Sequence, residues 1–434
     1  MAIDTPKWLK NSVIYEVFVR NYGNAGTFTD IYNDLERIKA LGTDIIWFMP
    51  FYPIGKVNRK GTHGSPYAIK DYENITPEIG SKDYFMKLID KAHENGLKVM
   101  IDIVFNHTSQ DSKLLETHPE WFLKDEYGNI KRKVESWNDV YDLDYSNREL
   151  WDYLINVLYG WVNIGVDGFR CDVAPLVPIE FWKEARERLN QNKEIIWLAE
   201  SLDLNFIYSL RKEGYNVHSD AEVYQAFDLT YDYDGFDYLR SYFRGEKDLS
   251  FYLNHLFLQQ TMLPTNSIKM RFLENHDNPR IASVLNGKDK IKNWSVFYNL
   301  LPGASLIYAG QELMFDKLPN LFEKDPIKWN NGDYEFLSFF KKIVNKCKEI
   351  KSECDDFNIR EISKGILEII WSNEEKEYIT ILNLEDRYGE IPVDFSVYGI
   401  DLLSNEIISI EKKFTIRKSP LIIQVNKRNS SWGE

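Results

Sequence analysis

The stretch GFRCDVA, residues 168–174, places an arginine and a carboxylate two positions apart at the end of a short apolar segment. Residues i and i+2 of an extended strand point to the same face, so Arg170 and Asp172 project together. An aspartate beside a fixed positive charge stays ionised at neutral pH, which is what a nucleophilic carboxylate requires. Taken alone, the pair is more typical of a structural ion pair, and the rest of the chain has to decide between the two interpretations.

Short β-branched or aromatic runs alternate with longer amphipathic runs on both sides of this stretch, which is typical of repeated βα units. The expected strands lie at residues 13–19, 44–49, 98–104, 167–172, 194–200, 223–229, 268–274 and 304–308. The clearest helices between and after them lie at residues 29–41, 81–95, 148–164, 178–190 and 334–350. Eight strands separated by helices predict a closed (β/α)8 TIM barrel rather than an open sheet.

Two segments do not follow the βα period. Residues 105–145 are irregular, and we interpret them as a short excursion, a domain B, from the loop after the third strand. From about residue 355 the apolar period changes to two, which predicts antiparallel strands without helices between them. We therefore expect a barrel from residues 1–104 and 146–350, the excursion at 105–145, and a C-terminal β-sandwich domain at 355–434.

Composition excludes several classes of protein. The 434 residues include 53 basic and 67 acidic side chains, and a net charge of -14 argues against nucleic acid as a partner. No apolar run is long enough for a signal peptide or a membrane span, so no membrane partner is expected. Three cysteines without ligand spacing fit a reducing compartment, which predicts a cytoplasmic protein.

Polar residues cluster where the expected strands end, which is where TIM barrels carry their catalytic groups. They are Asp102, Asn106 and His107 after the third strand, Arg170 and Asp172 after the fourth, Glu200 after the fifth, and Glu274, Asn275, His276 and Asp277 after the seventh. Three of the carboxylates, Asp172, Glu200 and Asp277, come from three different strands and are thus expected to meet on one rim. Two suffice for glycoside hydrolysis, because one attacks the anomeric carbon while the other protonates the departing oxygen.

The surroundings of each carboxylate suggest its role. Asp172, beside Arg170, suits the nucleophile, and Glu200, which ends the apolar run IIWLAE, suits the acid because apolar surroundings disfavour ionisation. Asp277 could hold ring hydroxyls of a distorted sugar. His107 and His276 could donate hydrogen bonds to the sugar, although either histidine alone is also typical of a buried structural residue.

Four segments together resemble the four sequence regions of the alpha-amylase family, glycoside hydrolase family 13. The segments are DIVFNH (102–107), GFRCD (168–172), WLAES around Glu200, and FLENHD (272–277). They follow the family's order, and GTDIIWFMP, the GSPYAIKDY loop and PGASLIYAGQEL look similar to it too. The resemblance covers the whole chain and implies an intracellular, amylase-like member.

The resemblance implies a role for each matching residue. Asp172 resembles the family's nucleophile, Glu200 resembles its acid/base, and Asp277 resembles its transition-state stabiliser. Arg170, His107 and His276 match residues that contact the nucleophile or the sugar at the cleavage site. Tyr67 resembles the ring that stacks beneath that sugar, and Asp102 resembles a buried supporting carboxylate. Asn106 and Asp142 match two oxygen ligands of a structural calcium site found in many relatives, and hard oxygen ligands suit Ca²⁺. A plain hydrogen-bonded loop is the alternative for this pair.

The sequence departs from the family's pattern at two places that affect which substrate is expected. Starch-cleaving members often have Lys-His three and four residues after the nucleophile, where this chain has Pro175 and Leu176. Many exo-acting members place Asp three residues before the stacking tyrosine, where this chain has Gly64, which favours an open, endo-type cleft.

The resemblance therefore predicts a retaining α-glycosidase that hydrolyses α-1,4-glucosidic bonds in maltodextrins or starch fragments through a covalent intermediate, with no cofactor required for the chemistry. A 4-α-glucanotransferase or a sucrose-type transglycosidase is the close alternative, since a sugar hydroxyl can replace water in the second step. A catalytically inactive carbohydrate-binding relative is the alternative from another class.

Overall fold

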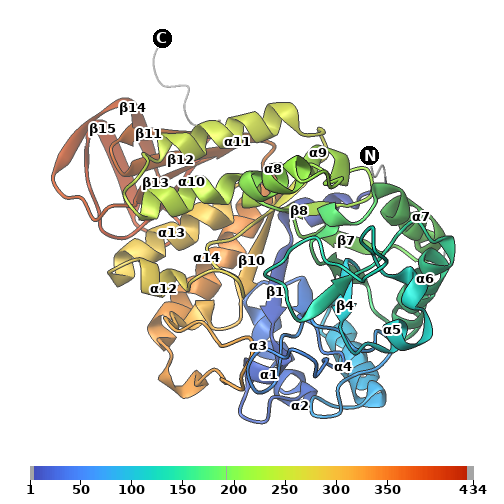
Figure 1. Ribbon diagram of the computed structural model, residues 1–434. Coiled ribbons are helices and arrows are strands. Elements are labelled where there is room, and N and C mark those ends of the chain that lie inside the picture. Colours follow the sequence, from blue (N-terminus) through green and yellow to red (C-terminus); the bar gives the residue numbers. More distant parts are fainter. Residues whose placement is uncertain (1–3, 192, 428–434) are drawn as a thin grey trace.

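The computed structural model describes residues 4–191 and 193–427. Residues 1–3, 192 and 428–434, which include the outer ends of the expected barrel and C-terminal domain, lie outside the described residues. Parallel strands form a closed barrel in the order β1-β10-β9-β8-β7-β6-β3-β2. These strands are β1 (Val13–Val17), β2 (Ile45–Phe48), β3 (Lys98–Ile103), β6 (Gly168–Cys171), β7 (Ile196–Ala199), β8 (Leu229–Tyr231), β9 (Ile268–Arg271) and β10 (Ala304–Tyr308). The predicted TIM barrel is confirmed (Figure 1).

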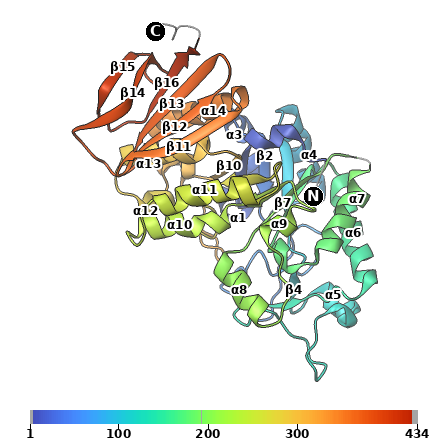
Figure 2. The same cartoon turned by 90° about the horizontal axis from the view of Figure 1, so that it is seen from above.

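Helices cover the outside of this barrel (Figures 1 and 2). The described α-helices, of which α5 belongs to the excursion after β3, are α1 (Val19–Tyr22), α2 (Phe28–Tyr32), α3 (Leu35–Ala40), α4 (Lys82–Glu94), α5 (Lys113–Thr117), α6 (Arg148–Asn163), α7 (Ile179–Asn190), α8 (Leu204–Lys212), α9 (Asp220–Val223), α10 (Tyr233–Phe243), α11 (Ser250–Met262), α12 (Ile281–Val284), α13 (Lys288–Leu300) and α14 (Tyr334–Glu353). In α6, the Asn147 side chain caps the first turn, and Leu150, Leu154, Leu158 and Trp161 recur every three or four residues to form the buried face. None of the described helices combines the length and apolarity needed to cross a membrane.

Strand β6, which carries GFRC of the opening stretch, packs closely against β7. A Cβ atom at Gly168 would lie 2.7 Å from the carbonyl oxygen of Ile196, so only glycine allows the two backbones to approach this far. All four residues of β6 are buried, as expected for a barrel strand covered on both faces. The close contact brings the C-terminal ends of β6 and β7 together on one rim.

The sixth barrel strand lies later in the chain than the sequence predicts. The prediction was 223–229, whereas β8 is Leu229–Tyr231 and residues 220–223 form helix α9. A capping box starts this helix, because the Ser219 and Glu222 side chains each accept from the other's backbone N–H. The shift brings Tyr231, rather than Leu229, to the end of the strand.

Residues 105–145 leave the barrel after β3, as the sequence predicts for the excursion. They contain a small antiparallel pair, β4 (His107–Ser109) and β5 (Val140–Asp142), in which His107 lies opposite Asp142. The segment therefore returns to the third strand's end, where its polar residues face the rim.

The C-terminal strands form one sheet, not the predicted β-sandwich. Its order is β11 (Asp356–Ser363), β12 (Ile366–Ser372), β13 (Lys376–Asn383), β16 (Leu421–Asn426), β14 (Glu390–Asp401) and β15 (Ile407–Thr415). Pairing between β14 and β16 is continuous with the rest, through Ile400 with Gln424. The six strands form an apolar core without a second sheet, because Val397 of β14 and Ile408 of β15 lie in the same core as Ile379 of β13. The other face of the sheet packs on the barrel beside α13 and α14.

Candidate active site

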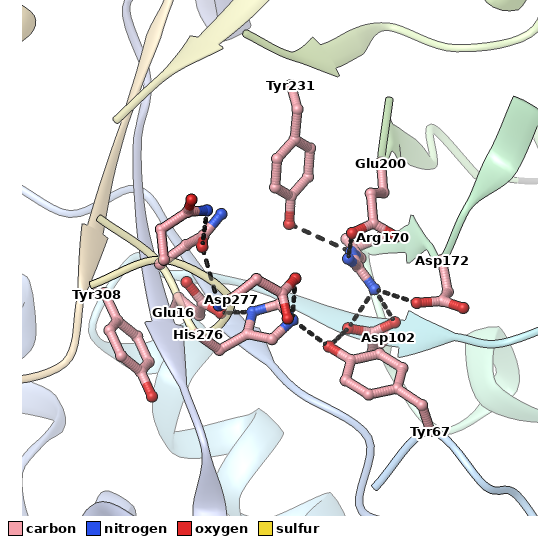
Figure 3. Close-up of polar contacts among 12 residues, drawn as sticks. Glu16, Tyr67, Asp102, Arg170, Asp172, Glu200, Tyr231, His276, Asp277 and Tyr308 are labelled. Carbon is pink, nitrogen blue, oxygen red and sulfur yellow. Dashed lines mark hydrogen bonds and ion pairs between the residues drawn. The ribbon is translucent and has the colours of Figure 1, made fainter. Parts of the chain in front are cut away.

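Arg170 lies at the centre of the rim and holds three carboxylates (Figure 3). Its side chain is fully buried at the end of β6. Atom Nη1 lies 2.9 Å from Asp102 Oδ1 and 3.0 Å from Asp172 Oδ1, while Nη2 lies 2.7 Å from Glu200 Oε1. The predicted convergence of Arg170, Asp172 and Glu200 is therefore present in the structure, and Asp102 from the neighbouring strand joins it.

The protonation of Asp172 differs from what the sequence predicts. The sequence analysis expects Arg170 to keep this carboxylate ionised. In the structure, burial and the neighbouring charge of Glu200 raise the pKa of Asp172 well above its usual range, and Arg170 opposes this rise only in part. Arg170 is shared among three carboxylates, so it cannot neutralise all of them, and the cluster binds protons near neutral pH.

The surroundings of Glu200 also differ from the prediction. The sequence predicts an apolar pocket, but both carboxylate oxygens meet polar donors. Oε1 pairs with Arg170, and Oε2 accepts the N–H of Val173 at 2.7 Å. Val173 has φ +37°, a left-handed conformation that is rare for a β-branched residue. This turn directly after Asp172 is what aims the Val173 N–H at Glu200.

Asp277 lies across the rim from the Arg170 cluster (Figure 3). Its side chain is 43% exposed, and Oδ2 lies 3.1 Å from His276 Nε2. Burial acts to raise the pKa of Asp277, but the neighbouring His276 lowers it below its usual range. The Asp277 carboxylate is consequently ionised, in contact with an imidazolium, and open to a ligand.

His276 is held as an imidazolium from two sides. Burial alone would lower its pKa, but Asp277 and Glu16 raise it well above the usual range. Nδ1 makes an ion pair with Glu16 of β1, and Nε2 donates to the Tyr67 hydroxyl at 2.7 Å. The Tyr67 ring stacks on the imidazole, with centroids 5.5 Å apart and planes inclined by 19°. Tyr67 and His276 thus form one flat wall of the site.

His107 is buried at the start of β4 and is neutral. Burial lowers the pKa of His107 to about 4. Its Nδ1 lies 3.1 Å from Asn106 Nδ2, an amide that can only donate, so the imidazole proton lies on Nε2. The Nε2–H of His107 is therefore a donor, and the Tyr67 backbone is one hydrogen-bond partner of this imidazole. A contact between His107 and a sugar stays a prediction.

Two of the carboxylates predicted at the rim, Asp102 and Glu274, do not reach the open site. Asp102 is fully buried and acts through Arg170 and the Tyr67 hydroxyl, which lies 3.4 Å from Asp102 Oδ2. Glu274 is buried on the other side of its strand end, where it pairs with Arg280 at 2.6 Å and accepts the Ile281 N–H. Glu274 therefore stabilises the strand end through Arg280 and lies apart from the carboxylates that surround Arg170.

The sequence analysis missed two residues of the site. Tyr231, at the end of β8, accepts a hydrogen bond from Arg170 Nε at 3.2 Å, and Glu16 of β1 pairs with His276. The misplaced sixth strand concealed Tyr231. Glu16 is the one acidic residue inside the otherwise apolar run VIYEV, and this interruption was the available signal.

The apolar pair Pro175 and Leu176, which follows Asp172, is buried in the fold. Leu176 is buried in a cluster with Val173 and Leu202, and the partly buried rings of Trp137 and Phe206 pack against it. The Trp137 ring also meets His107 edge-on, with centroids 5.5 Å apart. This side of the site therefore offers aromatic and aliphatic surface where a Lys-His pair would offer polar groups.

Gly64 lies before the stacking Tyr67 and adopts φ +79°. A Cβ atom there would lie 2.8 Å from Ile54 Cγ2 and 3.1 Å from Arg59 Cγ. An aspartate at this position would be strained and crowded.

Comparison with known proteins gives the family context for these residues. A family model described as the alpha amylase catalytic domain matches residues 13–128 and 120–361, well over half of the chain. The chain belongs to the alpha-amylase family. The four segments that suggested the resemblance, from Asp102 to Asp277, all lie within the matched residues.

Solved structures of alpha-amylases share the complete architecture. An alpha-amylase from Lactobacillus plantarum has 43% sequence identity and a TM-score of 0.92, and the match covers 97% of this chain and 100% of that one. A noncanonic maltogenic alpha-amylase, AmyB from Thermotoga neapolitana, has 35% identity and a TM-score of 0.86, covering 96% and 99% of the two chains.

Curated relatives are more distant and often longer. Alpha-amylase MalA of Haloarcula japonica is 24% identical over 423 residues, which are 93% of this chain and 60% of that protein. The chain thus spans less than two thirds of the length of this relative. An alpha-1,4-glucan:maltose-1-phosphate maltosyltransferase of Cereibacter sphaeroides is 36% identical over 197 residues, 41% of this chain and 33% of that protein.

Proposed function

We propose that the protein is a retaining glycoside hydrolase that cleaves α-1,4-glucosidic bonds in maltodextrins or short starch fragments. The sharing of one buried guanidinium by Asp172 and Glu200 carries this proposal, because it makes the two carboxyls close neighbours. Retaining enzymes separate their carboxyls by about 5 to 5.5 Å and inverting enzymes by about 6.5 to 9.5 Å, so close neighbours favour retention.

The first step assigns the proton of the cluster to Glu200. Burial and the charge of Glu200 raise the pKa of Asp172, so neutralising the charge of Glu200 would favour the ionised form of Asp172. When the glycosidic oxygen approaches Glu200, the proton lies on Glu200 and Asp172 is ionised. Asp172 forms a bond to the anomeric carbon as the bond to the departing oxygen breaks, and that oxygen takes the Glu200 proton.

Delivery of this proton requires a small rearrangement. Both oxygens of Glu200 are engaged here, Oε1 in an ion pair with Arg170 Nη2 and Oε2 in a hydrogen bond from the Val173 N–H, so one contact must open before Glu200 can donate. In the second step, Glu200 takes a proton from water, and the resulting hydroxide oxygen replaces Asp172 at the anomeric carbon.

The opposite wall of the site would hold the sugar. We propose that the ring stacks on Tyr67, that the ionised Asp277 accepts sugar hydroxyl hydrogen bonds, and that His276 and His107 donate to sugar oxygens. Hydrogen bonds to sugar hydroxyls that tighten in the transition state add several kcal/mol of stabilisation. The exposed carboxylate of Asp277, held by His276, supports this assignment.

The stereochemistry of the product tests the mechanism. Proton NMR of maltoheptaose hydrolysis should show the α-anomer first, followed by slow mutarotation to the equilibrium mixture. First appearance of the β-anomer would mean inversion and would refute the role given to Asp172. The chain length of the products, measured in the same reaction, reports endo or exo cleavage. The crowded Gly64 position supports endo cleavage, because it leaves no room for the aspartate of many exo-acting members.

A transglycosidase is the second candidate, since a maltosyltransferase is 36% identical over 41% of the chain. The apolar surface around Leu176, Trp137 and Phe206 also favours a sugar acceptor over bulk water. Early products longer than maltoheptaose would identify a transferase, whereas shorter products alone would identify a hydrolase. An inactive binding protein has no need for an intact Asp172, Glu200 and Asp277, and detectable turnover would exclude it.

We propose the cytoplasm as the location. Cys171, Cys347 and Cys354 are all free and buried, which suits a reducing compartment.

A further inference from the structure

A lysine of the excursion reaches the pair of residues expected to bind calcium. Lys133 Nζ donates to Asn106 Oδ1 at 2.7 Å and lies 3.4 Å from Asp142 Oδ1. The same ammonium donates to the backbone carbonyl of Leu176 at 3.2 Å. Its three oxygen partners come from the end of β3, from β5 in the excursion, and from the loop four residues after Asp172.

The remaining atoms of this group are already paired. Asn106 Nδ2 donates to Asp142 Oδ1 at 2.9 Å, and Asp142 Oδ2 accepts the backbone N–H of Lys133 at 3.0 Å. Asp142 is fully buried, and the Lys133 side chain is only 13% exposed. The single carboxylate of Asp142 is therefore matched by a single ammonium inside the protein.

These residues do not fit a calcium ion. Ca²⁺ takes six to eight oxygen ligands at about 2.3 to 2.6 Å, usually from several carboxylates. Among the described residues, Asp142 is the one carboxylate in direct contact with Lys133 or Asn106 in this group, and the Lys133 ammonium already faces the oxygens. Within residues 4–191 and 193–427, no cluster of three or more His, Cys, Asp or Glu side chains could hold a metal.

We propose that the Lys133 ammonium is the resident cation of this site and replaces a divalent metal ion. It ties the excursion to the barrel rim by joining three separate segments with one positive charge. A lysine in this position makes the fold independent of calcium. This inference stands apart from the proposed function, because it concerns the stability of the fold and does not depend on the reaction.

The position of Lys133 also connects it to the catalytic loops. Asn106, which accepts from Lys133, presents its amide to His107 Nδ1 at 3.1 Å. The Leu176 carbonyl belongs to the short turn that begins with Val173, whose N–H binds Glu200. Lys133 is thus a positioning residue that acts through Asn106 and the 173–176 turn, and does not touch the reacting groups.

Thermal unfolding of the full chain tests the proposal. Prolonged treatment with a chelator, followed by millimolar CaCl2, should leave the Tm of the wild-type protein unchanged. Lys133→Met keeps most of the aliphatic stem but removes the charge, so the buried Asp142 loses its partner. Its Tm should fall by about 5 °C or more, as expected when one partner of a buried ion pair is removed. The exposed Lys124 of the same excursion provides the control Lys124→Met, which should keep the wild-type Tm.

Lys133→Ala separates a cation site from an ordinary salt bridge. Removal of the side chain leaves the oxygens of Asn106, Asp142 and Leu176 without their cation, so a small ammonium ion such as methylammonium should raise the Tm of this variant while leaving the wild type unaffected. No response of Lys133→Ala to methylammonium would overturn the claim that the ammonium fills a cation site. A wild-type Tm that falls on chelation and recovers with CaCl2 would overturn the proposal even if neither lysine variant folds. An unchanged Tm in Lys133→Met would overturn it as well.

Discussion

Replacement of Asp102 by asparagine should change how the stability of the protein depends on pH. Asp102 is completely buried beside Arg170, and burial raises its pKa from 3.8 to about 7 although Arg170 acts in the opposite direction. A carboxyl with a higher pKa in the folded state binds more protons there than in the unfolded chain. Its contribution therefore favours folding at low pH and is lost as the pH rises through 7.

The size of this effect follows from the two pKa values. Roughly three pH units separate them, which corresponds to about 4 kcal/mol of unfolding free energy lost between pH 4 and pH 8. Asparagine resembles the neutral acid in shape and does not titrate. The free energy of unfolding of Asp102→Asn, relative to that of wild type, should therefore rise by up to about 4 kcal/mol over this pH range.

Urea unfolding of both proteins at several pH values between 4 and 8 measures this difference directly. Asp90 is exposed on α4, so Asp90→Asn provides a matched control whose difference from wild type should stay nearly constant with pH. A difference between Asp102→Asn and wild type that stays constant, or that falls as the pH rises, would refute the reasoning. Such a result would mean that Arg170 outweighs burial and keeps Asp102 ionised throughout.

Three further substitutions test separate parts of the site. Asp172→Asn should reduce kcat by about a thousandfold or more with an unchanged circular dichroism spectrum, and retained turnover would contradict its role as nucleophile. Tyr231→Phe removes the hydroxyl that accepts a hydrogen bond from Arg170 Nε. A hydrogen bond to a charged group contributes about 1.5 kcal/mol, so kcat/KM should fall about tenfold. A kcat/KM equal to that of the wild type would show that Tyr231 does not position Arg170. Glu274→Gln leaves the buried Arg280 without its charged partner, so the free energy of unfolding should fall by about 3 kcal/mol while the specific activity of the folded protein stays unchanged. Lost activity with normal stability would instead indicate a catalytic role for Glu274.

The barrel and its three rim carboxylates were predictable because two rules act at long range. The βα period locates strands, and the strand-end rule then brings residues as far apart as Asp172 and Asp277 to the same rim. The position of strand β8 was predicted wrongly, because a capping box formed by Ser219 and Glu222 begins a helix that ends at Val223, where the sequence predicts the strand to start. One misplaced strand was enough to conceal Tyr231.

Protonation could not be predicted from neighbouring residues in the sequence. Arg170 lies two positions from Asp172, which suggests an ion pair of one cation and one anion. The barrel adds Asp102 from β3 and Glu200 from β7 to the same guanidinium. One positive charge divided among three buried carboxylates leaves excess negative charge, and the cluster responds by binding protons. The local pair in GFRCDVA is thus incompletely neutralised, which suits the proton transfer of the proposed mechanism.

The proposed replacement of calcium by Lys133 illustrates a related point. The sequence motif contains Asn106 and Asp142, whose side-chain oxygens can accept contacts from a cation, so the motif predicts the position of a cation. The cation comes from Lys133, in an irregular segment with neither strand nor helix period to predict its direction. The motif therefore predicts that this site needs a positive charge, but it does not predict whether a metal ion or a side chain supplies that charge. In this chain a side chain can meet the requirement, because a single ammonium matches the charge of the single carboxylate of Asp142.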